Sequence, residues 1–372
     1  MIKKKDSLST LEDMFEYAKN NKYLKYLHKN SFPTITIKKM KNFLLACEEE
    51  VALKTKIESL PYRYIIDPTN ACNLACPLCP TGLNASHRIK GIMKMDKFVK
   101  IIDQIKDHCI EVHLYNWGEP TLNKKLSEML RYCSQNNIWT RISSNLSLTF
   151  KDGYLDELVK SGLSLLHVDL DGLDQDVYSK YRQKGDYNTV VKNIKELVKI
   201  KKRLKSNKPL IEVSMLAMKQ NEHQHEEFLN LKNSLGVDVV KIDKIQHNPN
   251  MDEKWLPENP ELIYSTYEKG LASSSASDEE NIKPCHWPWS GMVINWDGNV
   301  NPCCIIDDPN SDFDNIENNS IKDIWNSEEY ISSRSEFGDK TEITKENICN
   351  VCKNQTHSKR LNRVSKSFAI KL

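Results

Sequence analysis

The sequence predicts an α/β protein whose main part is an open, partial barrel of six strand–helix units. A helical extension is expected before the barrel and a small cysteine-rich domain after it. Three observations support this: strand and helix patterns alternate, one group of cysteines directly follows the first strand, and a second group lies in a C-terminal stretch without strong periodicity. Alternating strands and helices are typical of parallel sheets, and six strands are too few for a closed eight-stranded barrel.

Length and charge restrict the class of protein. At roughly 150 residues per domain, 372 residues predict two domains, or one large domain with an appendage. The net charge of +2 favours neither nucleic acid nor an anionic membrane as a partner. No run approaches the roughly 18 apolar residues that span a bilayer, and the lysine-rich start lacks the apolar segment of a secretion signal. We therefore expect a cytoplasmic protein whose eleven cysteines stay reduced, so that metal binding is their first explanation.

The predicted segments divide the chain into five parts. Residues 1–60 are expected to be helical, with one helix starting after Asp6 and Ser7 and another covering Ile37 to Leu53. The barrel is expected over 61–271. Its six strands are apolar or β-branched runs: Tyr62–Asp67, Ile110–Trp117, Ile138–Ser143, Leu165–Leu170, Leu210–Leu216 and Val237–Ile242. Helical patterns lie between them, around 95–107, 124–136, 153–161, 187–203 and 223–235.

The C-terminal part has a different texture. Residues 272–281 are small, polar and acidic and are predicted to form a linker. Residues 282–356 combine cysteine, proline and tryptophan, as expected of a small domain in which a metal site substitutes for a large core. Residues 357–372 are predicted to be a basic tail.

The first cysteine group is Cys72, Cys76 and Cys79, with the spacing Cys-x3-Cys-x2-Cys after the first strand. Three thiolates can bind three irons of a cubane cluster and leave the fourth iron open to a small chelating molecule. A zinc loop is the alternative, but structural zinc usually takes four ligands and no fourth one is adjacent. The spacing therefore favours a [4Fe–4S] cluster with an open iron.

The second group contains Cys285, Cys303, Cys349 and Cys352, which can supply four thiolates to one metal site. Spacing alone leaves both a zinc ribbon and a fully ligated iron–sulfur cluster possible. Cys304 is an additional thiol that either lies beside a ligand without a role, replaces a ligand, or donates a hydrogen atom to a substrate radical.

The first group is the signature of the radical S-adenosylmethionine (SAM) superfamily, which the sequence resembles over about 62–245. The resemblance implies a TIM-like partial barrel, in which SAM binds the open iron and is cleaved to a 5′-deoxyadenosyl radical that abstracts a hydrogen atom from the substrate. It also implies a flavodoxin- or ferredoxin-type electron donor. Residues 116–120 (NWGEP) resemble the family's GGEP element. The first glycine of that element is replaced here, so Asn116 and Trp117 depart from the family pattern.

The same resemblance assigns SAM contacts to the ends of successive strands. Gly118 and Glu119 are expected near the methionine ammonium, and Leu78 near the adenine. The remaining expected contacts are Ser144, Asn145, Asp171 and Arg182, of which Arg182 is placed at the SAM carboxylate.

The C-terminal segment resembles the SPASM/twitch extension of this superfamily. Its first half is Cys285-x12-Gly298-x4-Cys303, and no cysteine follows Cys352. The resemblance therefore implies one auxiliary [4Fe–4S] cluster, as in the shorter twitch type, whose members include an aminocyclitol dehydrogenase.

Together these features predict an oxidoreductase in which the auxiliary cluster accepts an electron from the substrate radical. The favoured reaction is dehydrogenation of an alcohol carbon in a sugar- or cyclitol-like molecule. The alternatives are maturation of a ribosomally made peptide, epimerisation of a sugar, and a non-enzymatic binding module. Tyr115, Asp169 and Cys304 are the candidate catalytic residues, and no spacing selects among them.

Overall fold

The structure is a computed structural model, and the residues that it describes are 10–17, 35–246, 251–264, 285–338 and 345–353. The predicted linker 272–281, the predicted tail 357–372 and the predicted helix start at Asp6 and Ser7 lie outside the described residues. None of the helices in the described ranges is long and apolar enough to cross a membrane.

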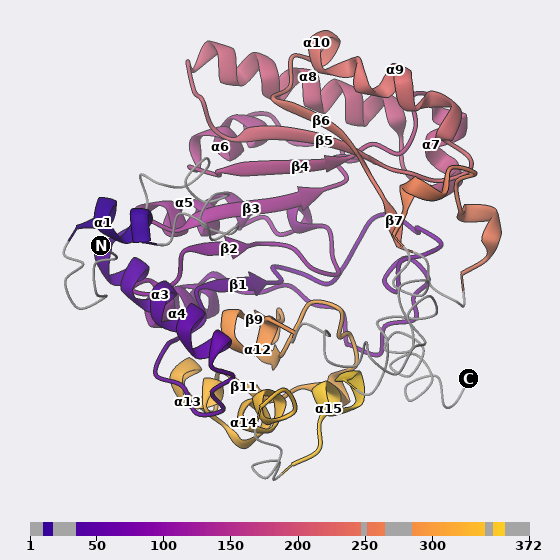
Figure 1. Ribbon diagram of the computed structural model, residues 1–372. Coiled ribbons are helices and arrows are strands. Elements are labelled where there is room, and N and C mark those ends of the chain that lie inside the picture. The colour runs from indigo at the N-terminus through magenta and orange to yellow at the C-terminus, as the bar shows by residue number, and fades with distance from the viewer. Residues whose placement is uncertain (1–9, 18–34, 247–250, 265–284, 339–344, 354–372) are drawn as a thin grey trace.

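Six parallel strands form the partial barrel, in the order of the chain (Figure 1). They are β1 (Arg63–Ile66), β2 (Glu111–His113), β3 (Trp139–Ser144), β4 (Leu165–Asp169), β5 (Leu210–Leu216) and β6 (Val239–Asp243). Every predicted strand is present. The largest difference is β2, which ends at His113 because the following residues leave the sheet to form the loop before Glu119.

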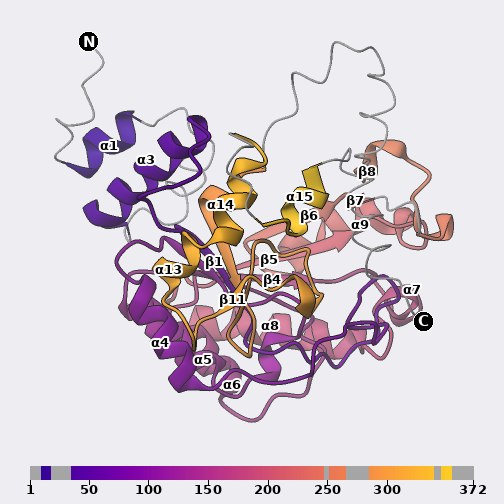
Figure 2. The same cartoon turned by 90° about the horizontal axis from the view of Figure 1, so that it is seen from below.

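Helices cover the outer face of this sheet, and Figure 2 shows α4, α5, α6 and α8 in one arc. The helices of this layer are α4 (Met95–Ile105), α5 (Leu126–Gln135), α6 (Tyr154–Lys160), α7 (Gln175–Tyr181), α8 (Tyr187–Arg203), α9 (His225–Leu229) and α10 (Leu231–Leu235). The predicted helix 223–235 is divided into α9 and α10, and α7 was not predicted. Strand residues such as Tyr64 and Ile66 point to these helices and form the main core with Phe98 and Ile101 of α4. Because side chains alternate across a strand, the intervening residues face the barrel interior.

The N-terminal extension packs against the barrel at the amino ends of β1 and β2. It contains α1 (Leu11–Tyr17) and α3 (Ile37–Val51), which begins at the N-cap Thr36. Met40 and Phe43 of α3 form a second core cluster with Tyr62 and Ile110, the residues that precede β1 and β2.

The C-terminal domain continues the barrel sheet. Strand β9 (Gly291–Ile294) pairs in parallel with β1, and β10 (Asn299–Asn301) and β11 (Asp314–Asn315) follow in antiparallel pairing. The sheet order is therefore β11-β10-β9-β1-β2-β3-β4-β5-β6. The sequence predicted a small appended domain, and its strands of two to four residues are too short to produce a visible periodicity. Its helices are α12 (Trp287–Ser290), α13 (Ile321–Trp325), α14 (Glu328–Ser335) and α15 (Ile348–Lys353).

Short elements complete the described fold. Strands β7 (Ile245–Gln246) and β8 (Ile263–Tyr264) pair with each other beyond β6. The 3-10 helices are η3 (Pro120–Leu122), η4 (Glu222–Gln224), η5 (Glu253–Trp255), η6 (Pro260–Leu262) and η8 (Pro309–Ser311).

One buried arginine joins the extension to the C-terminal domain. Arg334 of α14 donates from Nε to the Pro288 carbonyl at 2.8 Å, from Nη1 to the Thr55 carbonyl at 3.1 Å and from Nη2 to the Trp325 carbonyl at 2.7 Å. Its guanidinium also lies over the ring of Trp325. Since these carbonyls belong to three separate segments, Arg334 fixes the packing of the extension against α12 and α13.

Candidate active site

The cluster loop leaves the carboxyl end of β1. Cys72, Cys76 and Cys79 belong to a small hydrophobic cluster with Leu74 and Tyr181, and no fourth cysteine of the described residues joins it. The predicted adenine contact Leu78 packs against the same cluster. A soft donor set of three thiols in an apolar environment fits an iron–sulfur cluster with one open iron.

The loop after β2 lies directly against the loop after β1. A Cβ atom on Gly118 would lie 1.8 Å from the carbonyl oxygen of Thr69, so only glycine permits this approach. The next residue, Glu119, donates its backbone N–H to the Ala71 carbonyl at 2.8 Å. Gly118 therefore places the predicted SAM loop beside the residues that precede Cys72.

The carboxylate of Glu119 is buried and strongly hydrogen bonded. Its Oε1 accepts from the Thr121 hydroxyl at 2.6 Å and the Ser144 hydroxyl at 2.8 Å, and its Oε2 accepts from the Asn145 backbone N–H at 2.8 Å. Burial raises the pKa of Glu119, and these hydrogen bonds oppose the rise. Oε2 retains acceptor capacity for an ammonium group.

Two further predicted SAM contacts surround the cysteines. The side-chain amide of Asn145 lies 3.9 Å from Cys72 Sγ, and it donates to Asn73 Oδ1 at 3.0 Å. Arg182 follows α7 and pairs with the buried Asp171. Burial raises the pKa of the Cys72 and Cys76 thiols, and the charge of Arg182 opposes this rise. The structure thus brings residues that follow β2, β3 and β4 to the cluster loop that follows β1.

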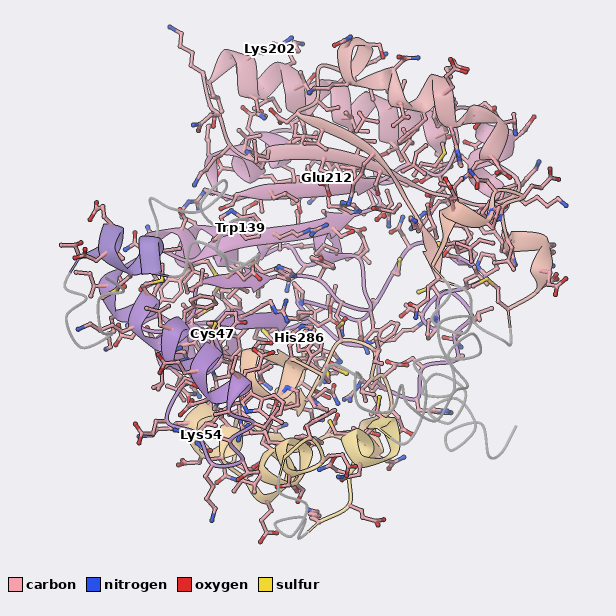
Figure 3. All side chains as sticks on the ribbon, viewed as in Figure 1. Cys47, Lys54, Trp139, Lys202, Glu212 and His286 are labelled. Carbon is pink, nitrogen blue, oxygen red and sulfur yellow. The ribbon has the colours of Figure 1, made fainter. Side chains whose placement is uncertain are left out.

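The inner face of β3 to β6 carries a chain of charged groups, of which the sequence analysis singled out only Asp169. His167 Nδ1 lies 2.7 Å from Glu212 Oε1, and His167 Nε2 lies 3.2 Å from Asp169 Oδ1. Glu212, labelled in Figure 3, also pairs with Lys241 at 3.3 Å and with Arg141 at 3.5 Å. The available signal was the alternation of charged residues inside apolar strands, because alternate positions share one face.

The pKa values of these charged groups depend on the ion pairs that they form with one another. Burial opposes the charged form of His167, but Asp169 and Glu212 outweigh burial and raise its pKa to about 9. Burial would raise the pKa of Asp169, yet Arg182 and His167 hold it well below its ordinary value. Asp169 is therefore a carboxylate at neutral pH, and 26% of its side chain remains exposed toward the interior.

Tyr115 follows β2, and its ring stacks on that of His113 with the ring centroids 5.7 Å apart. Burial raises the pKa of Tyr115 to about 12, with Arg141 opposing this rise and both Asp169 and Cys304 adding to it. The hydroxyl is therefore within electrostatic range of a barrel residue and of a thiol from the C-terminal domain. The pKa of Tyr115 is thus influenced by both other candidate catalytic residues, Asp169 and Cys304.

The four cysteines of the C-terminal domain line one cavity. Cys285, Cys303, Cys349 and Cys352 share it with hydrophobic side chains: Trp287, Pro288, Pro302, Ile306, Phe337 and Ile348. Four thiols around an enclosed apolar space fit a fully ligated cluster.

Residues 86–91, which follow the cluster loop, are attached to the C-terminal domain by an ion pair and by hydrogen bonds. Arg88 is almost fully buried, donates from Nη1 to Asp312 Oδ2 at 2.9 Å, and makes a second contact from Nη2 to Asp312 Oδ1. Nearby, Ser86 donates to Asp307 at 3.0 Å, and the Trp296 indole N–H donates to the Ile89 carbonyl at 3.1 Å. Residues 86–91 are thus held on the domain that carries the second cysteine group.

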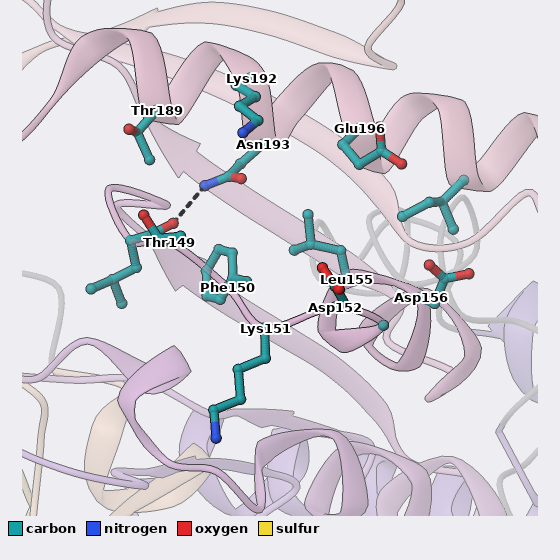
Figure 4. Close-up of a pocket in the computed structure, with 13 residues that line it drawn as sticks. Thr149, Phe150, Lys151, Asp152, Leu155, Asp156, Thr189, Lys192, Asn193 and Glu196 are labelled. Atoms are coloured by element: carbon teal, nitrogen blue, oxygen red, sulfur yellow. Dashed lines mark hydrogen bonds between the residues drawn. The ribbon is translucent and has the colours of Figure 1, made fainter.

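Another cavity lies outside this site, between the loop after β3 and helix α8 (Figure 4). Asn193 closes one end of it by donating to the Leu148 carbonyl at 2.9 Å. Its lining residues, which include Lys151, Asp156 and Glu196, contain none of the predicted site residues.

Two family models match the chain and together span both cysteine groups. The model of the radical SAM superfamily matches residues 66–231, and the model of the SPASM iron–sulfur cluster-binding domain matches residues 285–353. The chain belongs to the radical SAM superfamily and carries a C-terminal SPASM domain.

Among curated proteins, the chain is similar to the tungsten-containing aldehyde ferredoxin oxidoreductase cofactor-modifying protein of Pyrococcus furiosus, with 25% identity over 73% of this chain and 82% of that protein. A GTP 3′,8-cyclase of Clostridium botulinum is 25% identical over 48% of this chain, which spans about half of that protein's length. A PqqA peptide cyclase of Xanthomonas euvesicatoria is 22% identical over 72% of this chain and 75% of that protein.

Among solved structures, Streptococcus suis SuiB aligns with a TM-score of 0.59 and 18% identity, covering 86% of this chain and 79% of SuiB. A second SuiB structure, bound to its precursor peptide SuiA, aligns with a TM-score of 0.55 and 17% identity, covering 84% of this chain and 77% of SuiB. At this identity the likeness establishes the fold: a partial barrel with a C-terminal SPASM domain.

The family matches and the donor sets agree on the cofactors. The chain binds SAM and two [4Fe–4S] clusters. Bound together, SAM and its cluster supply the 5′-deoxyadenosyl radical. Cys72, Cys76 and Cys79 are the residues that would hold the SAM-binding cluster, and the cysteines of the C-terminal cavity would hold the auxiliary one.

Proposed function

We propose that this enzyme oxidises its substrate by two electrons, the first removed with a hydrogen atom and the second passed to the auxiliary cluster. The observation that carries the proposal is the parallel pairing of β9 with β1, which places the cavity lined by four cysteines beside the strand that leads into the cluster loop. A substrate in the barrel interior would lie between the SAM site and the auxiliary site.

The residues of the chain have separate tasks in this proposal. Glu119 would hold the methionine ammonium, and Arg182 the methionine carboxylate. Asp169 is the candidate proton acceptor, because it is ionised at neutral pH and partly accessible from the interior. The cysteines of the C-terminal domain would keep the auxiliary cluster fully ligated, which excludes the substrate from its irons and leaves it electron transfer as its simplest use.

The favoured substrate is a polar molecule with an oxidisable alcohol carbon, such as a sugar or cyclitol. The inner face of β3 to β6 supports this choice, since it carries the charged and hydrogen-bonding groups of Arg141, Glu212 and Lys241. Loss of the C–H hydrogen atom, the O–H proton and one further electron turns the alcohol into a carbonyl group. A flavodoxin- or ferredoxin-type protein would supply the electron that cleaves SAM.

Peptide maturation is the second candidate function. It is supported by the similarity to PqqA peptide cyclase over 72% of the chain and by the shared fold with SuiB, whose structure with a precursor peptide is known. The first reaction step is the same, and only the substrate and the fate of its radical differ.

Cysteine variants test the two-cluster mechanism. Reconstituted wild type should contain about eight iron atoms per chain. Cys76→Ala should abolish SAM cleavage, whereas Cys349→Ala should keep substrate-independent cleavage and lose product. Cys47→Ala, a change in the N-terminal extension, is the control and should retain both activities.

Sugar, cyclitol and precursor-peptide panels should be screened for substrate-dependent formation of 5′-deoxyadenosine. A response confined to peptides would replace the favoured substrate class by the second candidate. Normal product formation by Cys349→Ala would contradict the electron-acceptor role.

A further inference from the structure

Arg63 lies beside the auxiliary cluster cavity although it belongs to the barrel. It is the first residue of β1, and its side chain points away from the core face that Tyr64 and Ile66 occupy. Its guanidinium lies over the ring of Trp287, 4.7 Å from the ring centroid. Trp287 itself lines the cavity with the cysteines, so the guanidinium contacts a side chain of the cluster site.

The charge of Arg63 is not neutralised locally. Within the described ranges, no carboxylate lies within ion-pair distance of its guanidinium. Its Nη2 donates to the neutral Ser290 hydroxyl at 3.3 Å, and its Nε is buried without a hydrogen-bond partner. Glu50 is within its electrostatic range, since Arg63 opposes the rise in pKa that burial produces there. The Arg63 guanidinium therefore has no ion-pair partner among the described residues, and its charge also reaches the Cys304 thiol of the C-terminal domain.

A positive charge beside the cavity would favour electron acceptance by a cluster held there. A cluster with four thiolates becomes more negative on reduction, and an apolar environment disfavours that added charge. A fixed cation stabilises the reduced form, and its effect is large where little water screens it. Arg334 is a second buried cation near the cavity, bonded to Pro288, but its three carbonyl partners make it structural.

We propose that Arg63 is a positioning residue for electron transfer, which raises the reduction potential of the auxiliary cluster and so makes it an acceptor for the substrate radical. This inference rests on the electron-acceptor role proposed above. Arg63 exchanges no proton or electron itself. As the carbonyl forms, the electron that leaves the substrate radical would pass to the cluster, and the positive charge of Arg63 would lower the free energy of the reduced form.

The test is an anaerobic redox titration of the holoenzyme, followed by EPR. Arg63→Gln and Arg63→Met remove the charge, and Arg63→Lys keeps it. Arg131→Gln is the matched control, because it removes an arginine that pairs with Glu157 on the outer helical layer. The SAM-binding cluster, whose EPR signal changes when SAM is added, is an internal reference within every sample.

We expect both neutral variants to shift the auxiliary cluster to a more negative potential, with the SAM-binding cluster unchanged. Arg63→Lys and Arg131→Gln should stay close to wild type. The inference is overturned if the neutral variants titrate like wild type, or if Arg63→Lys shifts as far as they do, which is the pattern of a purely structural role. Wild type with only about four irons per chain would instead overturn the proposed function together with this inference.

Discussion

The Arg88–Asp312 pair offers the sharpest test of how the cluster loop is held. The Arg88 side chain is 2% exposed and the Asp312 side chain 12% exposed, and two contacts join them. Arg88 also donates to Asn301 Oδ1 at 3.3 Å. Substitution by methionine would keep much of the volume but leave the Asp312 carboxylate buried without its cation.

The expected loss follows from the burial. Removing one partner of a buried ion pair destabilises a protein by about 3–5 kcal/mol. An unfolding entropy of about 2.1 cal/mol/K per residue over 372 residues gives about 0.8 kcal/mol for each degree of Tm. Arg88→Met should therefore lower the Tm by about 4–6 °C, as measured by anaerobic calorimetry.

The controls separate this pair from ordinary surface charge. Arg131→Met breaks the half-exposed pair with Glu157 and should change stability by no more than about 1 kcal/mol. In the double variant Arg88→Met/Asp312→Leu, no charge is left buried, so it should be more stable than the sum of the single changes predicts. Equal Tm values for Arg88→Met and Arg131→Met, or simple additivity in the double variant, would refute the reasoning.

Two further predictions concern Gly118, in the loop after β2, and His167, on the inner face of β4. Gly118→Ala would place a Cβ 1.8 Å from the Thr69 carbonyl, and overpacking of about 1–3 kcal/mol should weaken SAM binding about 5- to 150-fold in equilibrium dialysis. Gly153→Ala is the control: its Cβ would meet nothing within 4 Å, but its φ of 81° strains the backbone of a non-glycine residue by about 1–2 kcal/mol. It should bind SAM normally, and weakened binding in this variant would show that general backbone strain, not the contact with Thr69, is responsible. For His167, the folded-state pKa of about 9 lies above the ordinary value, so its stabilising contribution is complete below about pH 6.5 and disappears as the pH rises through 9. The stability difference between wild type and His167→Gln should shrink by about 2–3 kcal/mol between pH 6 and pH 10 in chemical denaturation, and a pH-independent difference would contradict the pairing with Asp169 and Glu212.

The barrel could be predicted because its strands are apolar runs separated by amphipathic helices, a pattern that is local in the sequence. The three-cysteine loop could also be predicted, and most of the expected contact residues, such as Gly118, Ser144 and Asp171, directly follow a predicted strand. The structure places Gly118 against the loop after β1 and Asn145 beside Cys72.

Other parts of the fold and of the site could not be predicted, because they depend on contacts between residues that are distant in the sequence. The pairing of β9 with β1 joins residues more than 200 positions apart, and neither four-residue strand is distinctive by itself. Arg63 and Arg88 resembled ordinary charged residues, because burial of an arginine is decided by partners such as Trp287 and Asp312. The pairing of β4 with β5 brought His167 to Glu212, which only the three-dimensional register reveals.

The β9–β1 pairing has a consequence for the proposed electron transfer. Cys72 follows β1 by a few residues, and Cys285 and Cys303 flank the hairpin that β9 begins, so one pair of hydrogen-bonded strands supports both cysteine groups. Arg63 lies in the same strand pair, opposite Gly291. The Arg88–Asp312 ion pair joins the loop after β1 to the segment after β10. Since two packed strands and a buried ion pair resist relative movement, the distance between the two cluster sites is set by the barrel itself rather than by a hinge between domains.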